Sequence, residues 1–190
     1  MTTGEPGWDP GPDPFPQDDI RRIADFEYLD ELKFLRHAKV HVRKTPESLW
    51  QLAADFRVAM TVHLKDGGSR RLTIKAPRGL FTDLASVPQA LWAFAGPIGR
   101  HLEASVVHDY LYMAWTDFRD TGHPSLGRNR HFADAMFLAG MTVSKVAMRC
   151  PMYLAVRTVG GFVFRRKPYS LKQRMEDWLP LLDDGHGRSG

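Results

Sequence analysis

The sequence has a single cysteine, Cys150, and therefore cannot form an internal disulfide. A chain of 190 residues without such cross-links depends on its hydrophobic core, and this is typical of proteins from a reducing compartment. We expect Cys150 to be a small buried apolar side chain, because no histidine or lysine is placed to activate it as a reactive thiol.

Long apolar stretches are also missing. No run of about 18 apolar residues occurs, which argues against a transmembrane helix. The first residues lack the basic stretch and the apolar core of a signal peptide. We therefore expect a soluble cytoplasmic protein.

Charge is not balanced along the chain. The net charge is +4, the first 31 residues are rich in acid, and basic residues cluster from Arg149 to Arg174. Such a cluster attracts phosphate on nucleic acid or on an anionic lipid surface. The alternative is an ordinary solvated face, and no specific nucleic-acid motif accompanies the charge.

The ends of the chain differ from its middle. Prolines, glycines and aspartates fill residues 1–19, and this composition favours a disordered tail. Residues 183–190 are similarly polar and predict a flexible C-terminus. We expect one globular domain at 20–182.

Within this domain, residues 56–76 predict a β-hairpin, because apolar residues alternate on both sides of the turn Asp66-Gly67-Gly68. Most other segments show helical spacing, except for a strand-like alternation at 39–43. The sequence thus predicts an α+β fold that is mainly helical, with an N-terminal antiparallel β-hairpin region packed on an antiparallel helical hairpin. The expected helices are 20–35, 45–54, 86–92, 100–115, 129–148, 152–159 (ending at Gly160-Gly161) and 170–179.

His108 and Asp134 occupy matching positions in the two helices that flank the expected loop at 116–127. In an antiparallel pair each would lie about 20 Å from the turn, at 1.5 Å per residue, so the two side chains can face each other. A carboxylate that binds one imidazole nitrogen fixes the tautomer. The other nitrogen is then free to take a proton from water.

Two neighbours of His108 extend this group. Tyr112 lies one turn later on the same helix face, from which it can hydrogen-bond Asp134. Asp109 points about 100° away from His108 and is a candidate ligand for Ca²⁺ or another divalent metal, which prefer oxygen ligands. We predict that His108, Tyr112 and Asp134 are catalytic and that Asp109 and Asp83 bind the metal; a site without a cofactor is the alternative.

Arg100 and Arg130 are candidates for binding an anionic group of a substrate, although each can instead pair with a nearby acid. Asp83 can equally be a turn former or a helix cap. The whole group can also be a satisfied polar network between helices. Its density favours function, because burying charge that is not needed is costly.

Two motifs resemble one known family. The run Thr82-Asp83-Leu-Ala-Ser86-Val-Pro88 and the run His108-Asp109-Tyr-Leu-Tyr112 are similar to the domain of unknown function numbered 1353, which is met in phages, prophages and bacteria. The resemblance covers about residues 55–160. It implies a compact domain of phage or prophage origin, and with it phage virion proteins as partners and a virion-associated location as alternatives.

The group around His108 is also similar to the site of phospholipases A2, where a histidine activates water. The resemblance implies that His108 is the base, that Asp109 binds Ca²⁺, and that Asp134 orients His108 with support from Tyr112.

These observations give three hypotheses. The first is a His-Asp hydrolase of an ester or phosphoester, with lipid as the favoured substrate class. The second is a non-catalytic phage structural or assembly accessory with a buried His-Asp-Tyr network. The third is a metal-dependent phosphohydrolase that uses His101 together with His108, Asp109 and Asp134.

Overall fold

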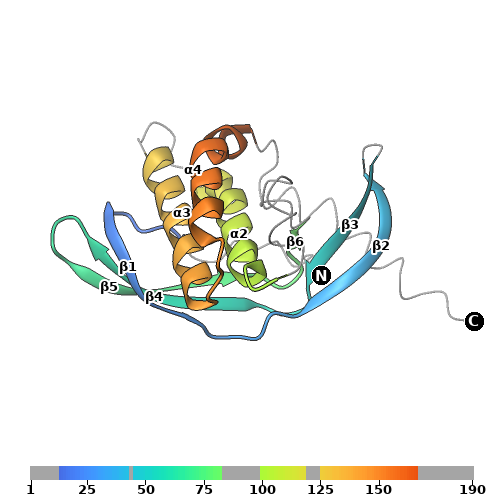
Figure 1. The fold of residues 1–190 in the computed structure, drawn as a ribbon, viewed down its shortest axis with the longest axis horizontal. Coiled ribbons are helices and arrows are strands. Elements are labelled where there is room, and N and C mark those ends of the chain that lie inside the picture. Colours follow the sequence, from blue (N-terminus) through green and yellow to red (C-terminus); the bar gives the residue numbers. More distant parts are fainter. Residues whose placement is uncertain (1–12, 43–44, 83–98, 119–124, 167–190) are drawn as a thin grey trace, which may run out of the picture.

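A layer of helices covers one face of an antiparallel sheet in the structure, a computed structural model that describes residues 13–42, 45–82, 99–118 and 125–166 (Figure 1). The sheet has the strand order β1-β4-β5. The elements of these two layers are β1 (Ile20–Tyr28), β4 (Phe56–Leu64), β5 (Ser69–Ala76), α2 (Leu102–Phe118), α3 (Ser125–Val143) and α4 (Arg149–Arg166).

A second sheet continues from the first. It consists of β2 (Phe34–Val42), β3 (Thr45–Leu52) and the short β6 (Phe81–Thr82), in the order β2-β3-β6. In Figure 1, β2 and β3 extend away from the helices. β6 pairs with the end of β3, where Trp50 lies opposite Thr82 and Gln51 lies opposite Phe81.

The predicted hairpin at 56–76 is confirmed as β4 and β5, which are antiparallel neighbours. Gly67 has φ of 97°, a conformation that glycine adopts without a steric penalty, and it forms the turn. Apolar residues of β4 such as Val58, Met60 and Val62 are fully buried. They face the helix layer and share one core with residues of α2 and α3.

The predicted antiparallel pair of helices is also present. A Cβ atom added at Gly140 of α3 would lie 2.9 Å from Ala104 of α2, while Asp134 of α3 contacts His108 further along α2. The helices α2 and α3 therefore run antiparallel to each other. α3 also packs against β1 and α4, and so it is the central helix of the layer.

The expectation of a mainly helical fold is wrong. The described residues form two three-stranded sheets beside the helices α2, α3 and α4, where the sequence predicted a single hairpin region. The difference lies in residues 20–52, which form β1, β2 and β3 where helices at 20–35 and 45–54 were expected.

β1 was mistaken for a helix because bulges break its alternation. Its pairing with β4 shifts between Ile20 and Arg22 and again between Ala24 and Glu27. Asp25, within the second shift, has φ of 48°. A bulge inserts an extra residue and changes which side chains face the core, so the apolar spacing of a bulged strand can imitate that of a helix.

β3 was mistaken for a helix because Thr45-Pro46 matches a common helix start. In the structure Pro46 is paired with His41 near the end of the β2-β3 ladder. A proline has no N–H to donate, and it is tolerated at strand ends for this reason. Hydrogen bonding between β2 and β3 has outweighed the local preference of Thr45-Pro46 for a helix start.

α4 is longer than predicted. Pro151 lies between the helices expected at 129–148 and 152–159, but in the structure it is in the first turn of α4, where its missing N–H has no intrahelical partner to lose. The helix continues through Gly160-Gly161, which were expected to end it, to Arg166. Cys150 is exposed at the start of α4, so the prediction that it is buried is wrong.

The end of the segment predicted as a disordered tail lies against the core. Phe15 is 3% exposed, and its ring meets that of Phe132 edge to face with centroids 6.3 Å apart. The structure does not describe residues 1–12 of that tail, the expected helices at 86–92 and 170–179, residues 119–124 of the expected loop, or the C-terminus at 183–190.

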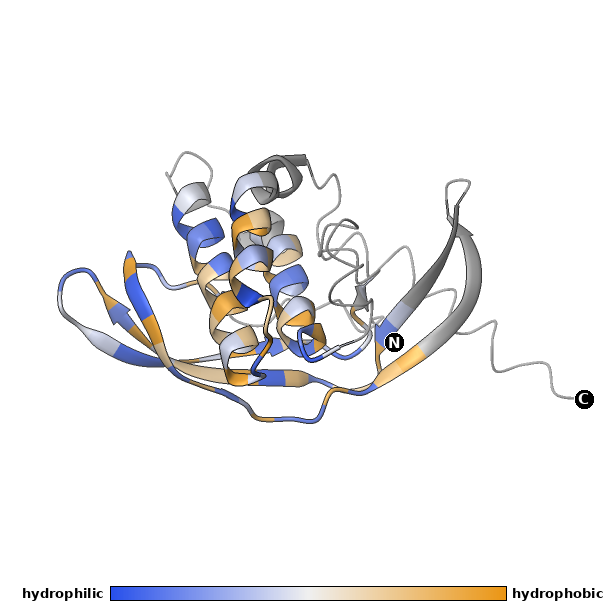
Figure 2. Cartoon of the chain, viewed as in Figure 1, coloured by the Kyte–Doolittle hydropathy of each residue, from blue (hydrophilic) through white to orange (hydrophobic). Residues whose placement is uncertain are grey.

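In the part of the chain that the structure describes, no helix is long and apolar enough to cross a membrane. Figure 2 shows why, since hydrophilic residues interrupt the hydrophobic ones along the helices.

Candidate functional site

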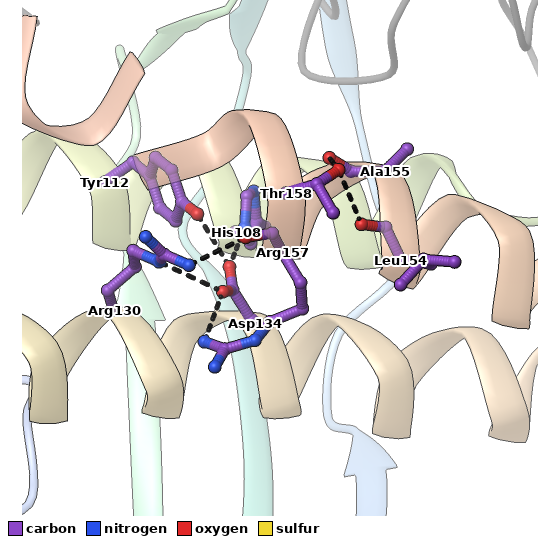
Figure 3. A network of polar contacts seen from close by, with 8 residues as sticks. All are labelled: His108, Tyr112, Arg130, Asp134, Leu154, Ala155, Arg157 and Thr158. Atoms are coloured by element: carbon purple, nitrogen blue, oxygen red, sulfur yellow. Dashed lines mark hydrogen bonds and ion pairs between the residues drawn. The ribbon is translucent and has the colours of Figure 1, made fainter. Parts of the chain in front are cut away.

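Three helices meet at a buried carboxylate. Asp134 of α3 is 0% exposed and contacts residues of α2, of α4 and of its own helix (Figure 3). The predicted contact with His108 is confirmed, because His108 Nε2 lies 3.1 Å from Asp134 Oδ1. Tyr112 is one turn further along α2, and its hydroxyl donates a hydrogen bond of 2.6 Å to the same oxygen.

Two arginines reach the other oxygen of this carboxylate. Arg157 Nη1 of α4 donates to Asp134 Oδ2 at 3.0 Å, and Arg130 Nε lies 3.5 Å from the same atom. Arg130 also donates through Nη2 to the backbone carbonyl of Arg157 at 2.8 Å. Asp134 thus joins all three helices.

The surroundings set the ionisation of the two acids in this group. Burial alone would raise the pKa of Asp134, but contacts with His108, Tyr112 and Arg157 outweigh it and lower the pKa. Burial and the adjacent carboxylate of Asp134 raise the pKa of Tyr112 well above its ordinary value. Tyr112 therefore stays a neutral donor, and Asp134 stays an ionised acceptor.

His108 has one ring nitrogen in contact with Asp134 and one without a partner among the described residues. Because Nε2 faces an ionised carboxylate, it carries the proton of the neutral ring, and Nδ1 has a lone pair. Nδ1 is buried and makes no hydrogen bond with the residues that the structure describes. The ring is held by Tyr112 and Phe137, whose centroids lie 4.1 and 5.0 Å away. This is the arrangement required of an oriented base.

Asp109 belongs to a second contact. It is 2% exposed, and its Oδ2 accepts a hydrogen bond of 2.9 Å from Oγ1 of Thr82, the last residue of β6. This bond joins the two motifs that were singled out in the sequence, Thr82-Asp83 and His108-Asp109. Asp83 itself lies outside the described residues.

No group of three or more histidines, cysteines, aspartates and glutamates that could hold a metal occurs in the ranges that the structure describes. Asp109, the candidate ligand among those residues, is enclosed and already accepts a hydrogen bond from Thr82. Of the two predicted metal ligands the structure describes only Asp109, so the Ca²⁺ site stays a prediction.

The structure separates the two arginines that were predicted to bind an anion. Arg130 is part of the contact group around Asp134. Arg100 is exposed, precedes α2 and makes no ion pair with any residue in the described ranges. It is eight residues before His108, about 12 Å along a helix, and it is not brought to the site.

Sequence reasoning missed Arg157. It lies within the basic cluster, for which the sequence predicts either attraction of phosphate or an ordinary solvated face, whereas its guanidinium binds the central carboxylate. The available signal was weak, because helix α4 carries several arginines and only its orientation on α3 selects one of them.

His101, a candidate ligand in the phosphohydrolase hypothesis, is buried, and burial lowers its pKa.

The geometry defines a class of protein: an α+β domain in which a helix layer on an antiparallel sheet holds a buried His-Asp-Tyr group. Residues 50–156 match the model of the family described as protein of unknown function (DUF1353), and the chain belongs to this family. The match includes Thr82, His108 and Asp134 and ends one residue before Arg157. No curated protein and no solved structure matches the chain.

Proposed function

We propose that the protein is a hydrolase of an ester or phosphoester in which His108 is the general base. The observation that carries this proposal is the state of the imidazole, whose Nε2 is held by Asp134 while Nδ1 makes no hydrogen bond with any residue that the structure describes. A base must be oriented, and it must also have a free lone pair at the reacting side. His108 meets both requirements.

The proposed reaction requires the helices to open so that water reaches His108 Nδ1. Nδ1 then takes a proton from a water molecule, and the resulting hydroxide adds to the carbonyl carbon or the phosphorus. The imidazolium that forms is stabilised by Asp134 across the 3.1 Å contact. It then returns the proton to the leaving alkoxide. Tyr112 and Arg157 are positioning residues, because they hold Asp134 and do not touch the reacting atoms.

A panel of carboxylic and phosphoric esters tests the proposal, with native protein compared with His108→Ala. Loss of a general base lowers a rate by about 10²–10⁴-fold. His63→Ala is the matched control, because His63 lies on the exposed side of the β4-β5 hairpin and hydrogen-bonds Ser69. Equal turnover by native protein and His108→Ala would end the proposal.

The enclosure of the group favours a second function. His108 is 2% exposed and Asp134 is 0% exposed, so in this state water does not reach Nδ1. A non-catalytic accessory protein would use the same contacts only to fix three helices relative to one another. In that case His108→Ala would lower the free energy of unfolding, and no ester in the panel would be hydrolysed by native protein.

The proposal also covers the origin of the protein, its location and a membrane partner. The motifs resemble those of phage and prophage proteins, and for this reason we infer a phage or prophage origin, with the cytoplasm of the host or the virion as the location. Mass spectrometry of purified virions and of the host cytoplasm distinguishes the two locations.

The basic charge of the chain favours an anionic lipid surface as a partner.

A further inference from the structure

Positive charge exceeds negative charge around Asp134. One carboxylate is shared by two guanidinium groups, which an arginine keeps charged at all physiological pH values. Of these three side chains only the carboxylate is fully buried. The side chains of Arg130 and Arg157 are 25% and 34% exposed, so the excess charge faces solvent.

Hydrogen-bond donors also remain available on both arginines. A guanidinium has five N–H donors in a planar fork. Arg157 uses Nη1 on Asp134 and makes no other side-chain hydrogen bond with the described residues. Arg130 uses Nε and Nη2, and its Nη1 is likewise without a partner in the described part of the chain.

The two forks are held close together. Arg130 donates to the backbone carbonyl of Arg157, and both side chains meet at the same carboxylate oxygen (Figure 3). Neither arginine has to be ordered when a ligand binds, which removes part of the entropic cost of binding. Paired guanidiniums with free donors match the oxygens of a phosphate group in charge and geometry.

We propose that Arg130 and Arg157 form a binding site for a phosphate-type oxyanion at the junction of α3 and α4. The inference rests on the proposed hydrolase function only in one respect: it names the substrate class, an ester that carries an anionic phosphate group. The oxyanion lies on the Oδ2 side of Asp134, across the carboxylate from His108. It is therefore a recognition group and not the group that is cleaved.

The direct test is a titration of the ¹⁵N-labelled full chain with inorganic phosphate, against chloride at equal ionic strength. The Nε–H signals of Arg130 and Arg157 shift and saturate, while that of Arg149 does not. Arg149 is the matched control, because it lies on α4 and donates to the carbonyl of Val146 instead of to Asp134. Absence of a saturable shift at Arg130 and Arg157 overturns the proposal.

Variants give an independent test. Arg130→Gln and Arg157→Gln each weaken phosphate binding by about 10-fold or more, which is the scale of a lost charge-assisted hydrogen bond. Arg149→Gln leaves binding unchanged, and equal weakening by this control overturns the proposal. Arg130→Gln is the milder change for the fold, because its contact with Asp134 is the longer one, and it decides the matter if Arg157→Gln does not fold.

Two further measurements identify the source of the phosphate group and distinguish failure of the oxyanion site from failure of the hydrolase proposal. Tighter binding to phosphatidate vesicles than to free phosphate, with no binding to phosphatidylcholine vesicles, assigns the site to a lipid headgroup; equal or weaker binding assigns it to a small anion. His108→Ala should keep phosphate binding. Phosphate binding without hydrolysis of any ester removes the hydrolase proposal alone, and hydrolysis without phosphate binding removes the oxyanion site alone.

Discussion

Two regions of the molecule hold their charged residues in opposite ways. At the ends of strands β1 and β4, Asp30 pairs with Arg57 and Asp19 pairs with Lys65, and these side chains are 23–65% exposed. In the helix layer, Asp134 is fully buried and binds four partners. Exposed pairs contribute little to stability, whereas removing one partner of a buried pair is strongly destabilising. The comparison teaches that the helix layer, and not the sheet, contains the charged group on which the structure depends.

The largest effect is expected for Asp134→Ala. The change leaves two guanidiniums and the Nε2–H of His108 without their acceptor, and breaking a buried ion pair costs about 3–5 kcal/mol. Urea denaturation of native protein and variant measures the difference. A loss no larger than that of an exposed ion pair would show that the two regions do not differ as described.

Tyr112→Phe sharpens the comparison inside the buried group. It removes only the hydroxyl that donates to Asp134 at 2.6 Å, and a hydrogen bond to a charged group is worth about 1.5–3 kcal/mol. The same denaturation experiment applies. Tyr153→Phe on α4 is the control, because this half-buried tyrosine makes no contact with Asp134 in the described structure; an equal loss in both variants would contradict the account.

Gly140→Ala tests the junction between the two regions. A Cβ atom at this position in α3 would lie 2.7 Å from the hydroxyl of Tyr28 in β1 and 2.9 Å from Ala104 in α2. Overpacking of this kind costs about 1–3 kcal/mol, even though alanine favours helix. Gly127→Ala on the same helix has open space around its Cβ and is expected to be neutral or stabilising. Equal effects of the two substitutions would exclude close packing at Gly140.

The smallest effect is expected at the exposed pair of Asp30 and Arg57. The hydrogen bonds from Arg57 lower the pKa of Asp30 to about 2. Since the folded-state pKa is below that of the unfolded chain, the pair stabilises the fold above about pH 4, and this contribution is lost as the pH falls through about 2. Asp30→Asn should remove this pH dependence and abolish a small stabilisation that salt also weakens. A loss comparable to that of Asp134→Ala would invalidate the comparison.

Local patterns were sufficient to predict the regular parts of the fold. The alternation on either side of Asp66-Gly67-Gly68 predicted β4 and β5, and helical spacing predicted α2 and α3. β1 was not predicted as a strand because the bulge at Asp25 interrupts its alternation. β3 was not predicted because Thr45-Pro46 matches a common helix start. Both errors concern residues whose structure is fixed by partner strands.

The candidate site was predictable to the extent that it depends on one pair of helices. Equal distances from the loop placed His108 opposite Asp134, and a spacing of four residues placed Tyr112 on the same face. Arg157 depends on how α4 packs against α3, which no local pattern specifies. Phe15 was missed for a similar reason, since its burial against Phe132 depends on where the proline-rich segment meets the core.

The tautomer of His108 tests the central claim most directly. In ¹⁵N-labelled protein, the chemical shifts of the two ring nitrogens report which of them carries the proton of the neutral ring, and we expect a protonated Nε2 and an unprotonated Nδ1. We also expect Asp134→Ala to change this preference. A protonated Nδ1 in the native protein would mean that Asp134 does not hold the imidazole as a base, and the proposed role of His108 would be contradicted.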